Sequence, residues 1–253
     1  MIEDILEMSG LTGGITSVWY ENLTTKQVVS RNEQTPLVAA SIIKLFIMAE
    51  AFRRFEEGTL DPGEFFTLHA EDKMPSCGAL TYMHDGLQVT CLDLVTLMII
   101  LSDNTATNLL IDRLGMENIN QMCQSVGGEG CRLNRKLFDA EAAARGIENT
   151  VTAAGVGAFL HRLYHGELVS ENASKQMLSI LKNQRLNGKI PFFLDCPIAH
   201  KTGEDDGITH DAAIVFAQNP FILVMLSNKT HVPNFERLMQ DAARDLAGMN
   251  IEE

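Results

Sequence analysis

A serine and a lysine three residues apart, Ser41 and Lys44, stand at the head of an apolar run that ends near Phe52. The turn-forming residues Thr35 and Pro36 shortly before them place Ser41 near the first turn of a helix. Residues three apart share one face of a helix, so the Lys44 amine can reach the Ser41 hydroxyl. A serine becomes a nucleophile when a neighbour takes its proton, and a lysine can do so when burial or nearby cations lower its pKa.

The pair taken alone also fits a structural role, because Ser-x-x-Lys occurs by chance in many chains of this size. In that interpretation Ser41 caps the helix and Lys44 is solvated. Two further motifs bear on the choice: Ser102-Asp103-Asn104 lies between two predicted helices, and Lys201-Thr202-Gly203 lies on a predicted strand. Each motif alone fits a helix-capping turn or a strand end. Their occurrence together, in this order, favours a shared chemical site.

Hydrophobic periodicity and turn residues indicate the elements that would hold these motifs. Residues 14–20 and 27–30 form a β-hairpin, the Ser41 helix continues to about residue 57, and the chain stays mainly helical to about residue 190. Thr90 is a helix cap with Asp93 at the third helical position. The other predicted segments are helices at 2–8, 91–101, 104–114, 152–160, 174–181 and about 234–247, strands at 198–202, 212–216 and 221–226, a weakly patterned surface loop at 132–149 and a break at 127–130.

Strands at both ends of the chain with helices between them predict an α/β (α+β) fold. We expect a five-stranded antiparallel sheet built from both termini, plus an inserted helical domain. Residues 1–39 and 191–253 would form the sheet with its terminal helices, and residues 40–190 the helical domain. The active site would lie between these two parts, which together make one functional unit.

Composition narrows the class of protein. The 253 residues fit one large domain or two closely packed ones, and 45% hydrophobic with 21% charged residues is typical of a soluble globular protein. A formal charge of −13 disfavours nucleic acid or an anionic membrane as the main partner. The five cysteines show no C-x-x-C spacing and are best interpreted as core thiols, with a Cys123–Cys131 disulfide left open.

With its three motifs in this order, the sequence resembles the penicillin-recognising serine hydrolases, in their class A β-lactamase-like branch. This superfamily holds the β-lactamases and the D-alanyl-D-alanine peptidases. The segment from Leu97 to Leu110, around the second motif, resembles the family's sequence there, and the resemblance spans nearly the whole chain. It implies the β-lactamase-like fold and an acyl-enzyme mechanism, with no cofactor and no metal.

The resemblance also implies a role for each motif residue. Ser41 would attack the substrate carbonyl, Lys44 would help to deprotonate Ser41, and Ser102 would pass the proton to the leaving nitrogen. Lys201 would bring positive charge to Ser102 and to the substrate carboxylate. Five further residues are implied in substrate binding, among them His210. Asn104 would hold Lys44 and a substrate amide, and Thr202 would bind the carboxylate. Gly203 would let substrate lie along the strand, and the N–H of Glu204 would join that of Ser41 in an oxyanion hole.

The chain departs from the family pattern in the loop after the second motif. The family's β-lactamases carry a glutamate there, in Arg-x-Glu, which activates the water that cleaves the acyl-enzyme. Here the sequence reads Arg135-Lys136-Leu137, and a leucine cannot act as a base. Asn149 stands where the family has an acid that would pair with Arg135. Three other acids lie nearby in sequence without matching the pattern: Asp139, Glu141 and Glu148.

A second departure concerns the substrate carboxylate. His210, seven residues after Gly203, stands in this register where the family often has an arginine on the next strand. A histidine is a cation only part of the time near neutral pH, so His210 either contributes to carboxylate binding or is a strand-start histidine without that role. The acids at 204–206 lie beside the expected pocket and should disfavour dianionic substrates.

We therefore expect a serine hydrolase that forms an acyl-enzyme and hydrolyses β-lactam amides with slow deacylation. Two alternatives stay open: a D-alanyl-D-alanine carboxypeptidase or another small peptidase or esterase, and a non-catalytic penicillin- or peptidoglycan-binding sensor. The expected partner is a small molecule, a β-lactam or a D-Ala-D-Ala-like peptide, bound by a monomer, with no nucleic acid and no membrane segment. The acidic start lacks a secretory signal, so either the protein is cytoplasmic or a leader has been removed from this sequence; the family that it resembles is usually extracytoplasmic.

Overall fold

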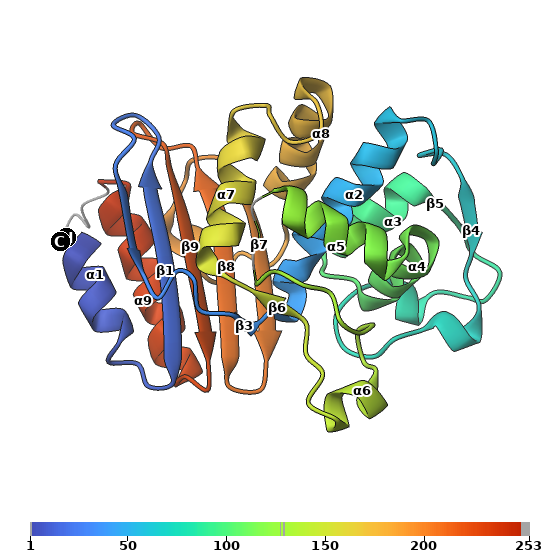
Figure 1. The fold of residues 1–253 in the computed structure, drawn as a ribbon, viewed down its shortest axis with the longest axis horizontal. Coiled ribbons are helices and arrows are strands. Elements are labelled where there is room, and N and C mark those ends of the chain that lie inside the picture. The colour runs from blue at the N-terminus through green and yellow to red at the C-terminus, as the bar shows by residue number, and fades with distance from the viewer. Residues whose placement is uncertain (1, 127, 129, 249–253) are drawn as a thin grey trace.

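The main sheet of the protein is built from both ends of the chain. A computed structural model describes residues 2–126, 128 and 130–248. It contains a five-stranded antiparallel sheet in the order β2-β1-β9-β8-β7 (Figure 1). The fold class expected from the sequence is confirmed. The strands are β1 (Ile15–Asn22), β2 (Val28–Arg31), β7 (Ile198–Asp205), β8 (Ile208–Val215) and β9 (Phe221–Asn228).

Helices cover both faces of this sheet (Figure 1). The helices α1 (Ile2–Ser9) and α9 (Val232–Leu246) pack together on one face, over a cluster of buried apolar side chains. On the other face α7 (Ala153–Tyr164) packs against β1 and β9, and α8 (Glu171–Lys182) packs against β7. The strand β8 is buried along its whole length because both of its faces are covered.

The remaining helices lie together beside the α7 face of the sheet (Figure 1). The helix α2 (Lys44–Glu56) is buried from Lys44 to Phe52 and forms part of their common core. A helix that is buried on all sides carries an apolar run without the usual polar face. The other elements are β3 (Leu37–Val38), the 3₁₀ helix η1 (Ala40–Ile43), β4 (Phe65–Thr67), η2 (Ala70–Asp72), η3 (Leu80–Tyr82), β5 (Gln88–Thr90), α3 (Cys91–Ile100), α4 (Asn104–Leu114), α5 (Met116–Ser125), α6 (Ala140–Ala144), β6 (Thr150–Val151) and η4 (Ile190–Phe193).

Local signals in the sequence predicted the five strands of the main sheet and the helices α1–α4 and α7–α9, but not α5, the short strands β3–β6 or the 3₁₀ helices. Thr90 caps α3 and forms the predicted capping box with Asp93. The loop at 132–149 contains the short helix α6, which its weak pattern did not indicate. The predicted break at 127–130 falls partly on residues 127 and 129, which lie outside the described residues. The separation of residues 40–190 as a domain stays a prediction.

The structure bears on two further predictions, the state of the cysteines and the absence of a membrane-spanning segment. All five cysteines carry free thiols, so Cys123 and Cys131 do not form the disulfide that the sequence left open. Within the described part of the chain, no helix combines the length and apolar character needed to cross a bilayer.

The contact of α7 with the sheet depends on a glycine. A β-carbon on Gly157 would lie 2.7 Å from the Trp19 ring, where β1 passes beneath the helix. The absence of a side chain at residue 157 therefore sets the distance between helix and sheet.

We predict that Gly157→Ala lowers the free energy of unfolding. Overpacking costs about 1–3 kcal/mol, whereas replacing a helical glycine by alanine gains about 1 kcal/mol, so a net loss is expected. Urea unfolding measures it. Gly188→Ala is the matched control, because a β-carbon there meets no atom within 4 Å. A Gly157→Ala protein as stable as wild type would contradict the close approach.

Candidate active site

Ser41 lies where the chain enters the helical region from β3. It is the second residue of η1, and Lys44 follows as the first residue of α2. Side chains three residues apart are eclipsed in a 3₁₀ turn, so Lys44 lies one turn below Ser41, as the sequence predicted. The preceding residue, Ala40, has φ of 42°, a left-handed conformation that alanine rarely adopts. Such strain persists only where surrounding contacts hold it, and it is often found at functional sites.

The Lys44 amine is fully buried and donates to three oxygens. Its Nζ lies 2.7 Å from the Ser102 carbonyl oxygen, 3.0 Å from Ser102 Oγ and 2.9 Å from Asn104 Oδ1. Three acceptors match the three protons of an ammonium group. The predicted meeting of the first two motifs is therefore present in the structure.

A second buried lysine reaches the same hydroxyl from the sheet. Lys201 Nζ lies 3.1 Å from Ser102 Oγ and 2.8 Å from the Thr202 carbonyl oxygen. Ser102 Oγ thus stands between the amines of Lys44 and Lys201. A hydroxyl can accept two hydrogen bonds and donate one, so this oxygen can pass a proton between neighbouring groups.

Burial of both amines changes their proton affinity. Burial lowers the pKa of Lys44 well below its usual value, and the nearby charge of Lys201 lowers it further. Burial and then the charge of Lys189 lower the pKa of Lys201 to about 7. An amine that is readily neutral near pH 7 can act as a base toward a neighbouring hydroxyl.

The second motif is held in place by its middle residue. Ser102 adopts a left-handed conformation, with φ of 55°, in the turn between α3 and α4. Asp103 caps α4 by accepting from the N–H of Ala106, and its other oxygen accepts from the N–H groups of Ala79 and Leu80. This one carboxylate therefore fixes both the serine turn and the loop that closes one side of the site.

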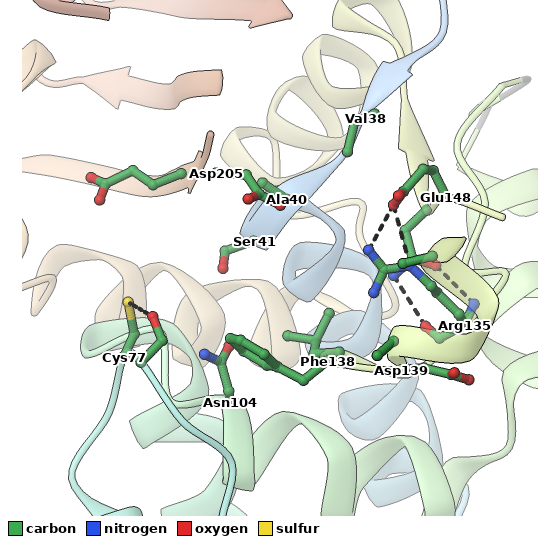
Figure 2. Close-up of a pocket in the computed structure, with 16 residues that line it drawn as sticks. Val38, Ala40, Ser41, Cys77, Asn104, Arg135, Phe138, Asp139, Glu148 and Asp205 are labelled. Atoms are coloured by element: carbon green, nitrogen blue, oxygen red, sulfur yellow. Dashed lines mark hydrogen bonds and ion pairs between the residues drawn. The ribbon is translucent and has the colours of Figure 1, made fainter. Parts of the chain in front are cut away.

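The site opens into a cavity of about 560 Å³. Ser41, Cys77, Asn104 and Phe138 border it, with Arg135 and Glu148 across from Cys77 (Figure 2). Strained conformations gather at the site, because three of the residues that line this cavity have a left-handed backbone: Ala40, Ser76 and Phe138.

The edge strand β7 brings the third motif to this cavity. Thr202 and Gly203 are buried, and Glu204 lines the cavity. A β-carbon on Gly203 would lie 3.0 Å from the His210 ring and 3.2 Å from Ile42. The glycine thus lets β7 pack closely against η1, a structural reason that stands beside the predicted contact with substrate.

His210 lies on β8 opposite Gly203, as the register predicted, but it is not among the residues that line the cavity. It is fully buried, and its Nε2 lies 2.8 Å from the Val38 carbonyl oxygen while its Nδ1 accepts from the N–H of Ser227 at 3.1 Å. Burial lowers the pKa of His210 to about 4, so the ring is neutral at neutral pH. The predicted contribution to carboxylate binding is therefore corrected: His210 joins β8 to the β3 segment and β9.

Leu137 lines the cavity, in the loop where the sequence indicated a missing base. The Asn108 amide holds the backbone of Leu137 from both sides: its Oδ1 accepts from the N–H and its Nδ2 donates to the carbonyl oxygen, each at 2.9 Å. The position of this backbone therefore does not depend on which side chain residue 137 carries.

The partner of Arg135 differs from the expected one. Arg135 Nη2 forms an ion pair with Glu148 at 2.6 Å, so the loop does have a closing acid, one residue before Asn149. Asn149 Oδ1 accepts from the N–H groups of Asn134 and Arg135, and its Nδ2 donates to the Arg135 carbonyl oxygen. Asn149 thus joins the two ends of the loop through the backbone.

Of the three acids considered for the missing base, Asp139 and Glu148 line the cavity. Asp139 Oδ1 caps α6 through the N–H of Ala142, and Glu148 is held by Arg135, so neither carboxylate is freely available. Glu141 does not line the cavity within the described residues. No group of three or more His, Cys, Asp or Glu side chains that could hold a metal ion occurs in the described part of the chain.

Sequence analysis missed two residues of the site, Cys77 and Lys189. Cys77 lines the cavity, and Lys189 lies buried against β7. Neither belongs to a motif, and both lie in segments without a strong periodic pattern. Only the folded arrangement brings them to the site.

Comparison with known proteins decides the family. The model of the β-lactamase enzyme family matches residues 2–249. The chain belongs to this family. The predicted resemblance and the predicted hydrolase class are thereby confirmed.

Curated relatives and solved structures agree with this family. An imipenem-hydrolysing β-lactamase of Enterobacter cloacae is 26% identical, over 84% of this chain and 76% of the relative. A β-lactamase structure from Sphaerobacter thermophilus has a TM-score of 0.89 at 26% identity and covers 98% of this chain and 97% of its own. The structure of PBP-A has a TM-score of 0.87 at 26% identity, over 97% and 94% of the two chains.

The buried Lys201 amine predicts a pH dependence of stability. Its pKa is about 7 in the folded protein and about 10.4 in an unfolded chain, so between these values only the unfolded state keeps the proton. Stability then rises with pH, by about 1.4 kcal/mol per pH unit from this one group, and falls as the pH drops toward 7. Lys201→Met should abolish this part of the slope.

Urea unfolding at several pH values, from about 7 to about 10, measures the difference between wild type and Lys201→Met. The same change at the exposed Lys175 is the control for loss of a lysine from the surface. Parallel pH profiles for wild type and Lys201→Met would refute the depressed proton affinity.

Proposed function

We propose that this protein is a serine hydrolase that forms an acyl-enzyme through Ser41 and acts on β-lactam amides, with slow deacylation. The observation that carries the proposal is the hydrogen-bonded cluster of Lys44, Ser102 and Lys201, in which Lys44 lies one turn from Ser41, and Ser41 itself lines a substrate-sized cavity. Cavities of several hundred Å³ are typical of small-molecule sites.

In the proposed acylation, Ser41 Oγ attacks the lactam carbonyl carbon and the C–N bond breaks. The Ser41 proton passes to Lys44, and through Ser102 to the leaving nitrogen, so the protein ends the step with its original number of protons. The N–H groups of Ser41 and Glu204 stabilise the oxyanion. The Ser41 N–H is available because N–H groups at the start of a helix lack intrahelical partners.

The other motif residues bind the substrate in this proposal. Protonated Lys201 attracts the substrate carboxylate, which Thr202 hydrogen-bonds, and Gly203 leaves the strand edge open to it. Asn104 Nδ2, which lies 3.3 Å from the Pro75 carbonyl oxygen, can turn to a substrate amide while its Oδ1 holds Lys44. No metal or cofactor is required for any of these steps.

Names of the relatives support β-lactams as the substrate class. One relative is an imipenem-hydrolysing β-lactamase, and a leucine-to-glutamate variant of PBP-A was solved as an acyl-enzyme complex with penicillin G. That variant's structure has a TM-score of 0.87 to this chain at 26% identity. Formation of a penicilloyl ester is therefore the step that we expect most directly.

We predict that Ser41→Ala abolishes covalent labelling by a fluorescent penicillin. The variant removes only the attacking oxygen and leaves the Lys44–Ser102 hydrogen bond intact, so the protein should stay folded. Gel fluorescence and intact mass after incubation measure the label, with circular dichroism as the control for folding. Undiminished labelling of a folded Ser41→Ala protein would rule out Ser41 as the nucleophile.

We predict a burst of about one equivalent of product per enzyme, then slow turnover, with a chromogenic cephalosporin. Acylation has its complete proton path, whereas deacylation lacks a positioned base at Leu137, and such a base contributes about 10²–10⁴-fold. Stopped-flow absorbance separates the two phases. Fast linear turnover without a burst would show that another group, such as Asp139 or Glu148, supplies the base.

The same experiment on two variants tests the cause of the slow phase. Leu137→Glu should accelerate steady-state turnover by about 10²-fold or more, because the Asn108 clamp keeps the backbone of residue 137 in place. Leu137→Gln is the matched control of equal size without a base and should stay slow. Equal rates for the two variants would exclude a missing base at residue 137.

The site also fits a D-alanyl-D-alanine peptidase, the first alternative, because Leu137 removes the group that the family's β-lactamases use for deacylation. Release of D-alanine from an acyl-D-Ala-D-Ala peptide identifies that activity. A stable penicilloyl adduct with neither turnover nor D-alanine release would instead identify the non-catalytic sensor.

A further inference from the structure

Lys189 is a buried lysine that no motif includes and that the proposed acylation does not use. Its side chain is 4% exposed, and its Nζ lies 3.2 Å from the carbonyl oxygens of Gly203 and His210. It forms an ion pair with Glu204 at 3.0 Å and lies 3.8 Å from Glu236 of α9. Burying an ammonium group is costly, and these contacts offset part of that cost.

The two carbonyl contacts reveal how the peptide groups of β7 are oriented. Gly203 pairs with His210 across the ladder. One amine can touch both carbonyl oxygens only if both point into the space between the strands, which is the arrangement of a hydrogen-bonded antiparallel pair. The Gly203 carbonyl therefore points toward β8.

The N–H of Glu204 must then point the other way. The Gly203 carbonyl and the Glu204 N–H belong to one trans peptide group, in which C=O and N–H are directed oppositely. β7 is the edge strand, so a group that points away from β8 points out of the sheet. Glu204 and Ser41 line the same cavity, and this N–H therefore faces the side where Ser41 lies.

We propose that Lys189 is a positioning residue of the oxyanion hole: its ammonium group, bound to the Gly203 carbonyl, orients and polarises the peptide group whose N–H stabilises the oxyanion. The inference rests on the proposed function and adds a residue to it. A cation on the carbonyl oxygen draws electron density through the amide, which makes the N–H at its other end a stronger donor.

Lys189 exerts this effect without touching the substrate. Side chains alternate along a strand, so Glu204, which binds Lys189, lies on the opposite face of β7 from Lys201, which binds Ser102. The segment around Lys189 is fixed on both sides: Gln240 donates to the Gly188 carbonyl oxygen at 2.8 Å, and the Ile190 N–H donates to Asp211 at 3.1 Å. The amine is thus held under the peptide before substrate binds.

The charge of Lys189 is only partly neutralised. The Glu204 side chain is 59% exposed, so water screens the carboxylate, while the amine itself is buried among the carbonyl oxygens. The uncompensated part of the charge acts on the carbonyl groups that the amine contacts, one of which belongs to the Gly203–Glu204 peptide.

The test is the infrared carbonyl band of the penicilloyl-enzyme, made with penicillin labelled with ¹³C at the lactam carbonyl. Stronger oxyanion-hole donors polarise this ester carbonyl and lower its frequency. Lys189→Met should therefore move the band to higher wavenumber and slow acylation by about 10-fold, less than the 10²–10³-fold of a lost donor. Lys189→Arg, which keeps the charge and donors, should restore both values toward those of wild type.

Two further variants separate positioning from loss of structure. Gln240→Ala removes an anchor of the Lys189 segment but leaves the amine, so it should lower the melting temperature without moving the carbonyl band. Lys189→Gln keeps an uncharged NH₂ donor group and should give an intermediate band; it serves in place of Lys189→Met if that variant does not fold. A folded Lys189→Met or Lys189→Gln protein with the wild-type band would overturn the inference.

Failure of the proposed function gives a different result. If wild-type protein forms no covalent adduct with the labelled penicillin, the acyl-enzyme proposal is wrong and the role of Lys189 falls with it. If wild type and variants all form the adduct with identical bands, the acyl-enzyme stands and only the inference about Lys189 is wrong.

Discussion

Two buried amines share one hydroxyl, and the rest of the site depends on this arrangement. The Nζ atoms of Lys44 and Lys201 lie 3.0 and 3.1 Å from Ser102 Oγ, and neither side chain is exposed. Two full charges so close in a dry site repel each other, and each also loses its hydration. The repulsion and the loss of hydration lower the proton affinity of both lysines. A lowered proton affinity is what an amine needs for proton transfer near neutral pH.

The fold supplies the acceptors that make this burial tolerable. Carbonyl oxygens of Ser102 and Thr202 and the amide oxygen of Asn104 take the remaining amine protons, and each comes from a different element: a turn, the edge strand β7 and the start of α4. Those elements meet only because the sheet from the two chain ends packs against η1. A shift of β7 by one residue would turn Lys201 away from Ser102.

Sequence analysis predicted the parts of the site that depend on short-range pattern. Ser41 and Lys44 are three residues apart, and such spacing fixes their relation within one turn. The Thr90 capping box and the antiparallel strands were predictable for the same reason. The register of His210 was predicted correctly, opposite Gly203, but counting along a strand does not tell whether a ring nitrogen faces the cavity or the Val38 carbonyl.

Residues that act across elements left no signal in the sequence. Glu148 pairs with Arg135 because the loop folds back on itself. The family's sequence pattern expects the closing acid at position 149, so it did not indicate the acid one residue earlier. Lys189 belongs to no motif, and its contact with Gly203 of the third motif forms only when the segment before η4 packs against β7. Its role depends on which way a single peptide group points, and only the strand pairing determines that.

The loop that carries Leu137 shows how a catalytic group can be absent without loss of the surrounding structure. Asn108 binds the N–H and carbonyl of Leu137, and the Arg135–Glu148 pair closes the loop. From one end of the loop, the Asn149 side chain binds the backbone of Asn134 and Arg135 at the other end. None of these contacts uses the side chain of residue 137. The loop geometry and the chemistry at its tip are therefore physically independent. In the proposed mechanism the amines, the hydroxyls and the oxyanion donors belong to other elements, so a change at residue 137 would alter hydrolysis of the acyl-enzyme and not its formation.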